Sequence, residues 1–167
     1  MEILFENKYT RDKEWAKDIN SYIWFRRPII IVLDIIFALY ILIGIYNSIT
    51  SNVVDWFYIL IPIIWCVFVA FIYRKNVNTV IKRDLELHGK AIEVTVTVAE
   101  DIIKQSQSTG SEFQLNYCDI KKVVQTKKYI YLWSKTNMLY SFKRNSFSFG
   151  AADEFLLFLK NKGIKVK

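Results

Sequence analysis

Residues 28–46, PIIIVLDIIFALYILIGIY, and residues 53–73, VVDWFYILIPIIWCVFVAFIY, decide the fold of this 167-residue chain. A bilayer core about 30 Å thick needs about 20 helical residues, and each stretch is long and apolar enough to cross it. The link between the two stretches, NSITSN, is short and polar, so two spanning helices must be antiparallel neighbours. The sequence therefore predicts a two-helix transmembrane hairpin over residues 28–75.

Basic residues flank this predicted hairpin at its outer ends and are absent from its link. Arg26 and Arg27 precede the first span, and Arg74 and Lys75 follow the second. Positive charge accumulates on the cytoplasmic side of spanning helices. We therefore expect a multi-pass membrane protein with both its N-terminus and its C-terminus in the cytoplasm. A cleaved signal peptide is not expected, because the first apolar stretch starts late and is too long.

Asp34 lies about two turns into the first span. A carboxylate at such a depth is a candidate intramembrane functional residue. The alternative is structural: Asp34 stays protonated, or reaches the basic residues at the inner surface. We favour the structural role, because Asp34 is close to the inner end of the span.

Residues 1–27 form a separate N-terminal cytoplasmic segment in this interpretation. Residues 2–9 suit a short strand, and a helix follows with Thr10 as its N-cap. One face of that helix is apolar, at Trp15, Ile19, Tyr22 and Ile23. Such a helix either lies along the membrane surface or packs on the C-terminal domain, and the sequence favours neither.

Residues 76–89 predict a helical linker that stops at Gly89. After this linker, the spacing of the apolar residues changes from the helical period to strict alternation. Short predicted strands follow in hairpin order, over 91–99, 101–107, 112–117, 118–126, 129–134 and 138–142. Residues 151–162 then predict a helix with an acidic first turn. Residues 90–167 therefore predict a cytoplasmic antiparallel β domain closed by one C-terminal helix, and the fold class is α+β.

The string KKYIYLWSKTNMLYSFKRNSF (127–147), followed by GAADEFLLFLKNKG (150–163), resembles the C-terminal domain of the YcxB-like family of bacterial membrane proteins. The matching features are the tyrosine-rich YIYL strand, Arg144 in the basic position, Phe147 and the acidic-Phe helix. Lys143 stands where that family has a proline. The resemblance covers about residues 90–163 by motif, and the two preceding spans match the family layout. It implies a small pleckstrin-homology-like (PH-like) barrel, a bacterial cell membrane, and no established activity.

Catalytic chemistry has little support in the residues. The chain has a net charge of +7, with the basic excess in residues 74–167, but no nucleotide-binding, hydrolase or metalloprotease motif. His88 has no companion ligands at metal-binding spacing, and Cys66 and Cys118 are expected to be reduced thiols. We therefore predict no enzyme activity, no cofactor, no metal and no nucleic-acid partner.

Four basic residues of the β domain are the candidate partner-binding set: Lys127, Lys128, Lys143 and Arg144. They suit an anionic lipid headgroup or an acidic protein partner, or else form a solvated rim. The leading hypothesis is a non-enzymatic, membrane-tethered binding or regulatory module. An immunity protein against a membrane-active toxin is the alternative, and a transporter subunit that uses Asp34 is a third class.

Overall fold

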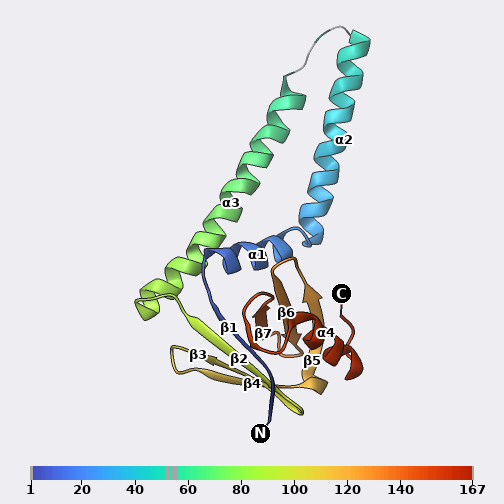
Figure 1. The fold of residues 1–167 in the computed structure, drawn as a ribbon. Helices are drawn as coiled ribbons and strands as arrows, with labels where there is room; N and C mark the ends of the chain where they lie inside the picture. The colour runs from blue at the N-terminus through green and yellow to red at the C-terminus, as the bar shows by residue number, and fades with distance from the viewer. Residues whose placement is uncertain (1, 52, 54–55, 167) are drawn as a thin grey trace. The chain divides into compact units, whose positions relative to one another are not determined.

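The computed structural model describes residues 2–51, 53 and 56–166. The chain divides into two compact units, one of residues 1–18 and 81–167 and one of residues 19–80. The first, the sheet unit, holds all the described strands and helix α4. The second, the helical unit, holds α2 and most of α3 (Figure 1).

The sheet unit contains two antiparallel sheets, where the sequence predicted one. The larger sheet has the order β4-β3-β2-β1-β8, and the smaller has the order β5-β6-β7. The strands of the larger sheet are β1 (Ile3–Thr10), β2 (Glu93–Ala99), β3 (Ile102–Gln107), β4 (Glu112–Asn116) and β8 (Phe147–Phe149). Those of the smaller sheet are β5 (Ile120–Gln125), β6 (Tyr129–Ser134) and β7 (Leu139–Lys143). A single 3₁₀ turn, Tyr117–Asp119, separates the two sheets in sequence, where one predicted strand began.

Strand β1 belongs to the larger sheet, although the sequence analysis placed it in a separate N-terminal segment. It pairs with β2 from Ile3↔Ala99 to Thr10↔Glu93, and with β8 on its other edge. Alternating residues of β1 and β2 are buried, among them Phe5, Val96 and Val98. The first strand of the chain therefore lies inside the sheet.

Helix α4 (Ala152–Asn161) closes the sheet unit through an aromatic cluster. The ring of Phe155, fully buried, lies 4.5 Å from Phe142 and 5.5 Å from Phe5, measured between centroids. The Ser/Phe segment before this helix predicts that Phe147 and Phe149 pack under it, and Phe147 joins the cluster at 6.0 Å from Phe155. The same prediction was wrong for Phe149, which is 57% exposed. The pairing of β1 with β8 shifts register between Asn7, opposite Phe147, and Glu6, opposite Phe149.

Gly150 forms the turn between β8 and α4. Its φ of +74° is a conformation that L side chains rarely adopt. A Cβ at this position would lie 2.4 Å from a ring carbon of Phe5. Glycine therefore meets both the backbone and the packing requirements of the turn.

The helical unit is dominated by α2 (Pro28–Ser51) and the first part of α3 (Phe57–His88). Within the described residues, these two helices are long and apolar enough to cross a membrane. Most of their apolar side chains are exposed, so they are unlike the buried core helices of soluble domains. Rings contact across the two helices: Phe37 lies 5.1 Å from Trp65, and Tyr40 lies 4.6 Å from Tyr58.

The ends of these helices differ from the predicted ones. Residues 47–51 of the predicted polar link continue α2, and there the hydroxyls of Thr50 and Ser51 donate to carbonyls one turn back in the helix. Val54 and Asp55, at the start of the predicted second span, lie outside the described residues, as does Asn52. The predicted linker 76–89 is the continuation of α3, which ends where Gly89 adopts a φ of +68°.

Helix α1 (Lys13–Trp24) begins two residues later than predicted. The side chain of Asp12, not Thr10, accepts the backbone N–H of Trp15 at 2.8 Å and so acts as the N-cap. Trp15 is buried and its indole N–H donates to Ser141 of β7 at 3.1 Å. The first half of α1 thus packs on the sheet unit, one of the two alternatives that the sequence left open.

Candidate anion-binding site

The register of the smaller sheet brings three of the four predicted basic residues together. Lys127 and Lys128 lie in the turn between β5 and β6, and Lys143 ends β7. Tyr129 pairs with Lys143 across β6 and β7, so this turn lies beside the end of β7. We call Lys127, Lys128 and Lys143 the lysine cluster.

The end of β7 is fixed by a buried amide. Asn7 of β1, fully buried, accepts the backbone N–H of Lys143 at 3.0 Å and donates to its carbonyl at 2.8 Å. Buried polar groups are costly unless they are paired, so this pair of hydrogen bonds defines the position of the β7 terminus. The lysine cluster therefore depends on β1 as well as on the smaller sheet.

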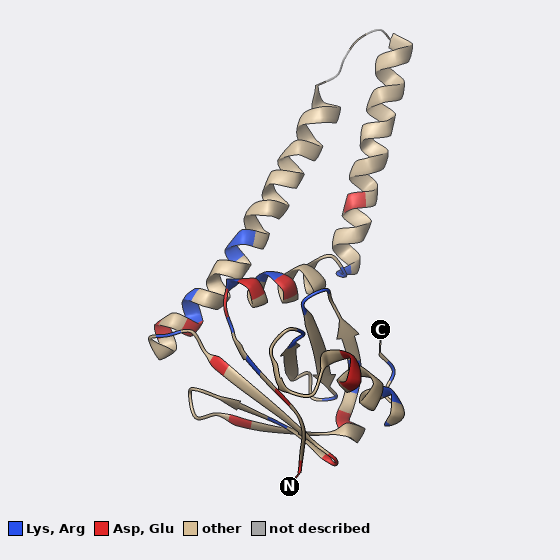
Figure 2. Cartoon of the chain, in the orientation of Figure 1, with Lys and Arg blue, Asp and Glu red and all other residues tan. Residues whose placement is uncertain are grey.

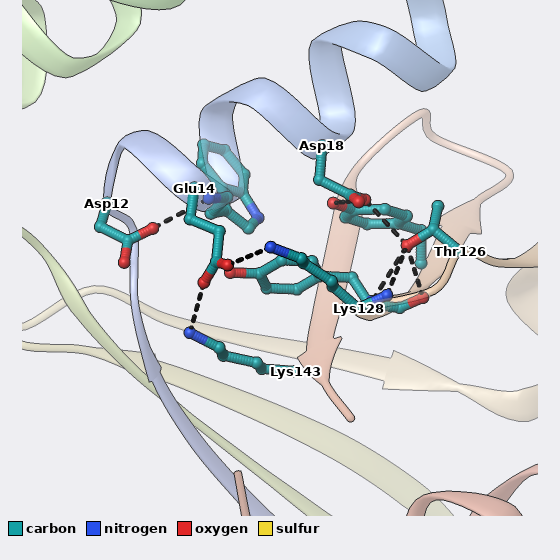
Figure 3. Close-up of polar contacts among 9 residues, drawn as sticks. Asp12, Glu14, Asp18, Thr126, Lys128 and Lys143 are labelled. Carbon is teal, nitrogen blue, oxygen red and sulfur yellow. Dashed lines mark hydrogen bonds and ion pairs between the residues drawn. The ribbon is translucent and has the colours of Figure 1, made fainter. Parts of the chain in front are cut away.

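Glu14 is the carboxylate bound by the lysine cluster (Figure 3). One of its oxygens lies 2.5 Å from the ammonium of Lys128 and the other lies 2.8 Å from that of Lys143. Glu14, the three lysines and Asn145 line a hollow of about 120 Å³. The surface therefore already binds one carboxylate, supplied by the first turn of α1.

The ion pairs stabilise the charged forms of their members. Hydrogen bonds from Lys128 and then Lys143 lower the pKa of Glu14 to about 2. The hydrogen bond with Glu14 raises the pKa of Lys128 in turn. Glu14 and Lys128 consequently stay charged at neutral pH.

Arg144, the fourth predicted residue, is directed to a different partner. Its guanidinium lies 2.6 Å from the carboxylate of Asp153 in the first turn of α4, and 3.3 Å from the side-chain oxygen of Gln125. Its backbone N–H donates to the carbonyl of Lys128. Arg144 thus links β7 to α4 and does not line the hollow.

A second carboxylate, Asp18, fixes the turn that carries two of the lysines. It accepts hydrogen bonds from the hydroxyls of Tyr131 at 2.8 Å and Thr126 at 2.9 Å. Thr126 also accepts the backbone N–H groups of Lys128 and Tyr129. Burial, and then the bond to Asp18, raises the pKa of Tyr131 above its ordinary value, so its hydroxyl remains a donor.

Tyr129 lies against the lysine cluster from within the sheet unit. The ammonium of Lys143 lies 5.9 Å from the centre of its ring, within cation–π range. The side chain is fully buried, and among the described residues its hydroxyl has no hydrogen-bond partner. Burial raises the pKa of this phenol, so it stays neutral.

Glu14 and Asp18 were not found by sequence reasoning. Their spacing of four residues on a helix was visible, but their partners lie more than a hundred residues away. Only the docking of α1 on β6 and β7 reveals them as part of the site.

Asp34 lies on α2, which is otherwise uncharged (Figure 2). Its carboxylate accepts the indole N–H of Trp65 on α3 at 3.1 Å. The structure thus places it between two helices of the helical unit. It does not meet the basic residues to which the sequence analysis related it.

The potential metal ligands and the thiols were located within the described ranges, 2–51, 53 and 56–166. No group of three or more His, Cys, Asp or Glu side chains that could hold a metal ion occurs there. Cys66 and Cys118 are both exposed free thiols. His88 lies in the last turn of α3.

Comparisons of the chain with protein-family models, with curated proteins and with solved structures found no match.

Proposed function

We propose that this chain is a non-enzymatic membrane protein in which α2 and α3 anchor a cytoplasmic binding module. The anchor is supported by the length, apolar composition and exposed apolar side chains of both helices. Each lies within the range needed to cross a bilayer, and α3 extends beyond it. The basic residues that flank the hairpin favour a cytoplasmic location for the module in a bacterial cell membrane.

The pairing of β1 with β2 independently supports a hairpin. Thr10 precedes both apolar helices and Glu93 follows them, yet the two residues are paired in one sheet. A chain that crosses a bilayer between them has to cross it an even number of times. Two crossings, by α2 and α3, satisfy that requirement.

The module is, in this proposal, a PH-like domain of the YcxB-like type. The support is a pair of antiparallel sheets with α4 packed at their end. The YIYL motif lies in β6 (Tyr129–Ser134), and α4 (Ala152–Asn161) begins two residues after Gly150.

The lysine cluster is the ligand-binding surface, and an acidic segment of a protein partner is its ligand. The observation that carries this proposal is the bound carboxylate of Glu14 between Lys128 and Lys143. Exposed ion pairs contribute little to stability, so a partner's carboxylate can replace Glu14 at small cost. Lys127 is exposed and forms no ion pair within the described part of the chain, so it adds attraction for the incoming anion.

The test uses the full chain in lipid nanodiscs and a fluorescent hexaglutamate peptide. Glu14→Gln is expected to tighten binding several-fold, because it releases two ammonium groups from their internal partner. Lys127→Glu is expected to weaken binding to the same extent or more. Glu100→Gln is the matched control, since it removes one exposed carboxylate from an ion pair with Lys162 elsewhere in the sheet unit.

Equal binding by wild type, Glu14→Gln and Lys127→Glu would refute the proposal. Binding to phosphatidylserine vesicles without binding to the peptide would assign the lysine cluster to lipid headgroups instead. Crosslinking in cells, compared between wild type and Lys127→Glu, then identifies the partner. The immunity alternative has no supporting contact in the described residues and is not adopted.

A further inference from the structure

A second cavity lies within the helical unit, remote in sequence from the lysine cluster. It has a volume of about 580 Å³ and is lined by residues of α2, α3 and the end of α1. Apart from Asp34, its walls are apolar or aromatic and include Trp24, Phe37, Trp65 and Tyr73. Cavities of about 300–1,000 Å³ with apolar walls and few polar groups are typical of small-molecule sites.

No ion pair engages the carboxyl group of Asp34 among the described residues. Among the described residues, its polar partner is the neutral indole N–H of Trp65, at 3.1 Å. The nearby arginines are engaged elsewhere: the guanidinium of Arg26 lies 4.5 Å from the ring of Tyr22, and that of Arg27 lies 5.2 Å from the ring of Trp24. A carboxylate in apolar surroundings is strongly disfavoured unless a positive charge accompanies it.

The aromatic residues beside Asp34 suit a cation. Trp65 stacks on Phe37, with 5.1 Å between ring centroids and an interplanar angle of 26°, and it also contacts Phe68 at 6.1 Å. The faces of aromatic rings attract cations, most strongly in the case of tryptophan. Asp34 and Trp65 therefore place a negative charge and an electron-rich ring in the same cavity.

We propose that this cavity binds one hydrophobic organic cation, with its charge at Asp34 and its apolar groups among the aromatic residues. A metal ion or a hydrated inorganic cation is a poor match, because a single carboxylate in an apolar wall cannot replace a hydration shell. A neutral lipid chain or a helix of a second copy would fill the volume but leave the charge unmatched. The proposal rests on insertion of the hairpin into a membrane, which gives the site its apolar surroundings.

The probe pair is tetraphenylphosphonium and tetraphenylborate, which have nearly the same size and shape but opposite charge. Binding is measured by equilibrium dialysis on the full chain in nanodiscs, against empty nanodiscs. Saturable binding of the cation, with no saturable binding of the anion, is expected. Asp34→Asn retains an oxygen acceptor for the Trp65 indole and is expected to reduce cation affinity at least tenfold.

Two further variants keep the result interpretable. Trp65→Phe removes the N–H donor and the indole face, and is expected to weaken binding of the cation several-fold. Ser48→Ala, on α2 but outside this cavity, is the control and is expected to bind as wild type does. Retention of each variant in purified nanodiscs reports membrane insertion independently of cation binding.

Equal uptake of both ions, or unchanged affinity in Asp34→Asn, would overturn the proposal and leave a lipid-filled cavity. If the chain inserts and elutes as a dimer but shows no saturable cation binding, the proposal is overturned, and the cavity is instead filled by a helix of a second copy. Failure to insert would refute the membrane proposal itself, a result distinct from the other two.

Discussion

The coupling between Asp18 and Tyr131 can be isolated by a double-mutant cycle. Asp18→Ala removes the acceptor of two hydroxyl groups, those of Tyr131 and Thr126. Thr126 keeps a second acceptor, the carbonyl of Tyr129 at 3.2 Å. Tyr131 is fully buried, and among the described residues its hydroxyl has no hydrogen-bond partner besides Asp18. The main cost is therefore the unpaired phenol.

Leaving a buried donor without a partner costs about 1–3 kcal/mol, and a hydrogen bond to a charged group contributes about 1.5–3 kcal/mol. We expect Asp18→Ala to lower the free energy of unfolding of the sheet unit by about 2–3 kcal/mol. Tyr131→Phe removes the donor itself and should cost about 1–1.5 kcal/mol. In the Tyr131→Phe background, Asp18→Ala should then cost at least about 1 kcal/mol less than it does alone.

Thermal unfolding of the full chain in detergent, followed by near-UV circular dichroism of the aromatic residues, measures the cycle. For a unit of about 100 residues, 1 kcal/mol corresponds to a shift of about 4–8 °C in Tm. Asp18→Asn retains an acceptor oxygen and should shift Tm less than Asp18→Ala. Strict additivity of the two substitutions would refute the assignment of Asp18 as the partner of the buried phenol.

Three further predictions concern pH and packing. The pKa of Glu14 lies near 2, below its ordinary 4.5, so its ion pairs stabilise the fold fully above about pH 4.5 and are lost as the pH falls toward 2. Tm should therefore decline more steeply between pH 4.5 and 2 in wild type than in Glu14→Gln. Parallel profiles of Tm against pH would contradict this. Gly150→Ala should destabilise the sheet unit by about 2–4 kcal/mol, through its positive φ and the contact with Phe5, and an unchanged Tm in a thermal melt would count against both causes. Gly44→Ala brings a Cβ to 2.3 Å from that of Tyr58, so spin-label distances between α2 and α3 should increase, whereas identical distances would show that Tyr58 turns aside.

Much of the architecture was predictable because its signals are local. Alternation of apolar residues marks β2 over residues 93–99, and the apolar stripe with Gly163 behind it marks α4. The α+β class, two long apolar helices and an antiparallel sheet region are confirmed by the structure. Membrane crossing, the PH-like type and the cell location remain proposals.

The features that were missed depend on contacts between distant segments. Strand β8 is three residues long, and its pairing with Asn7 and Glu6 of β1 leaves no local pattern. The place of β1 in the larger sheet depends on its pairing with β2, which follows the two long helices. The lysine cluster was predicted from charge alone, but its carboxylate partner required the docking of α1.

The place of β1 in the sheet has a consequence for biosynthesis. Thr10 leaves the ribosome long before its partner Glu93, and at about 5–20 residues per second the delay is on the order of ten seconds. During that time both apolar helices emerge, so the hairpin can reach the membrane while β1 still has no neighbouring strand. Unpaired strand edges are prone to aggregate, and β1 carries charged side chains at Glu6 and Lys8 that oppose this. In the proposed membrane arrangement, the final pairing of β1 with β2 then joins the two ends of a segment that is already inserted.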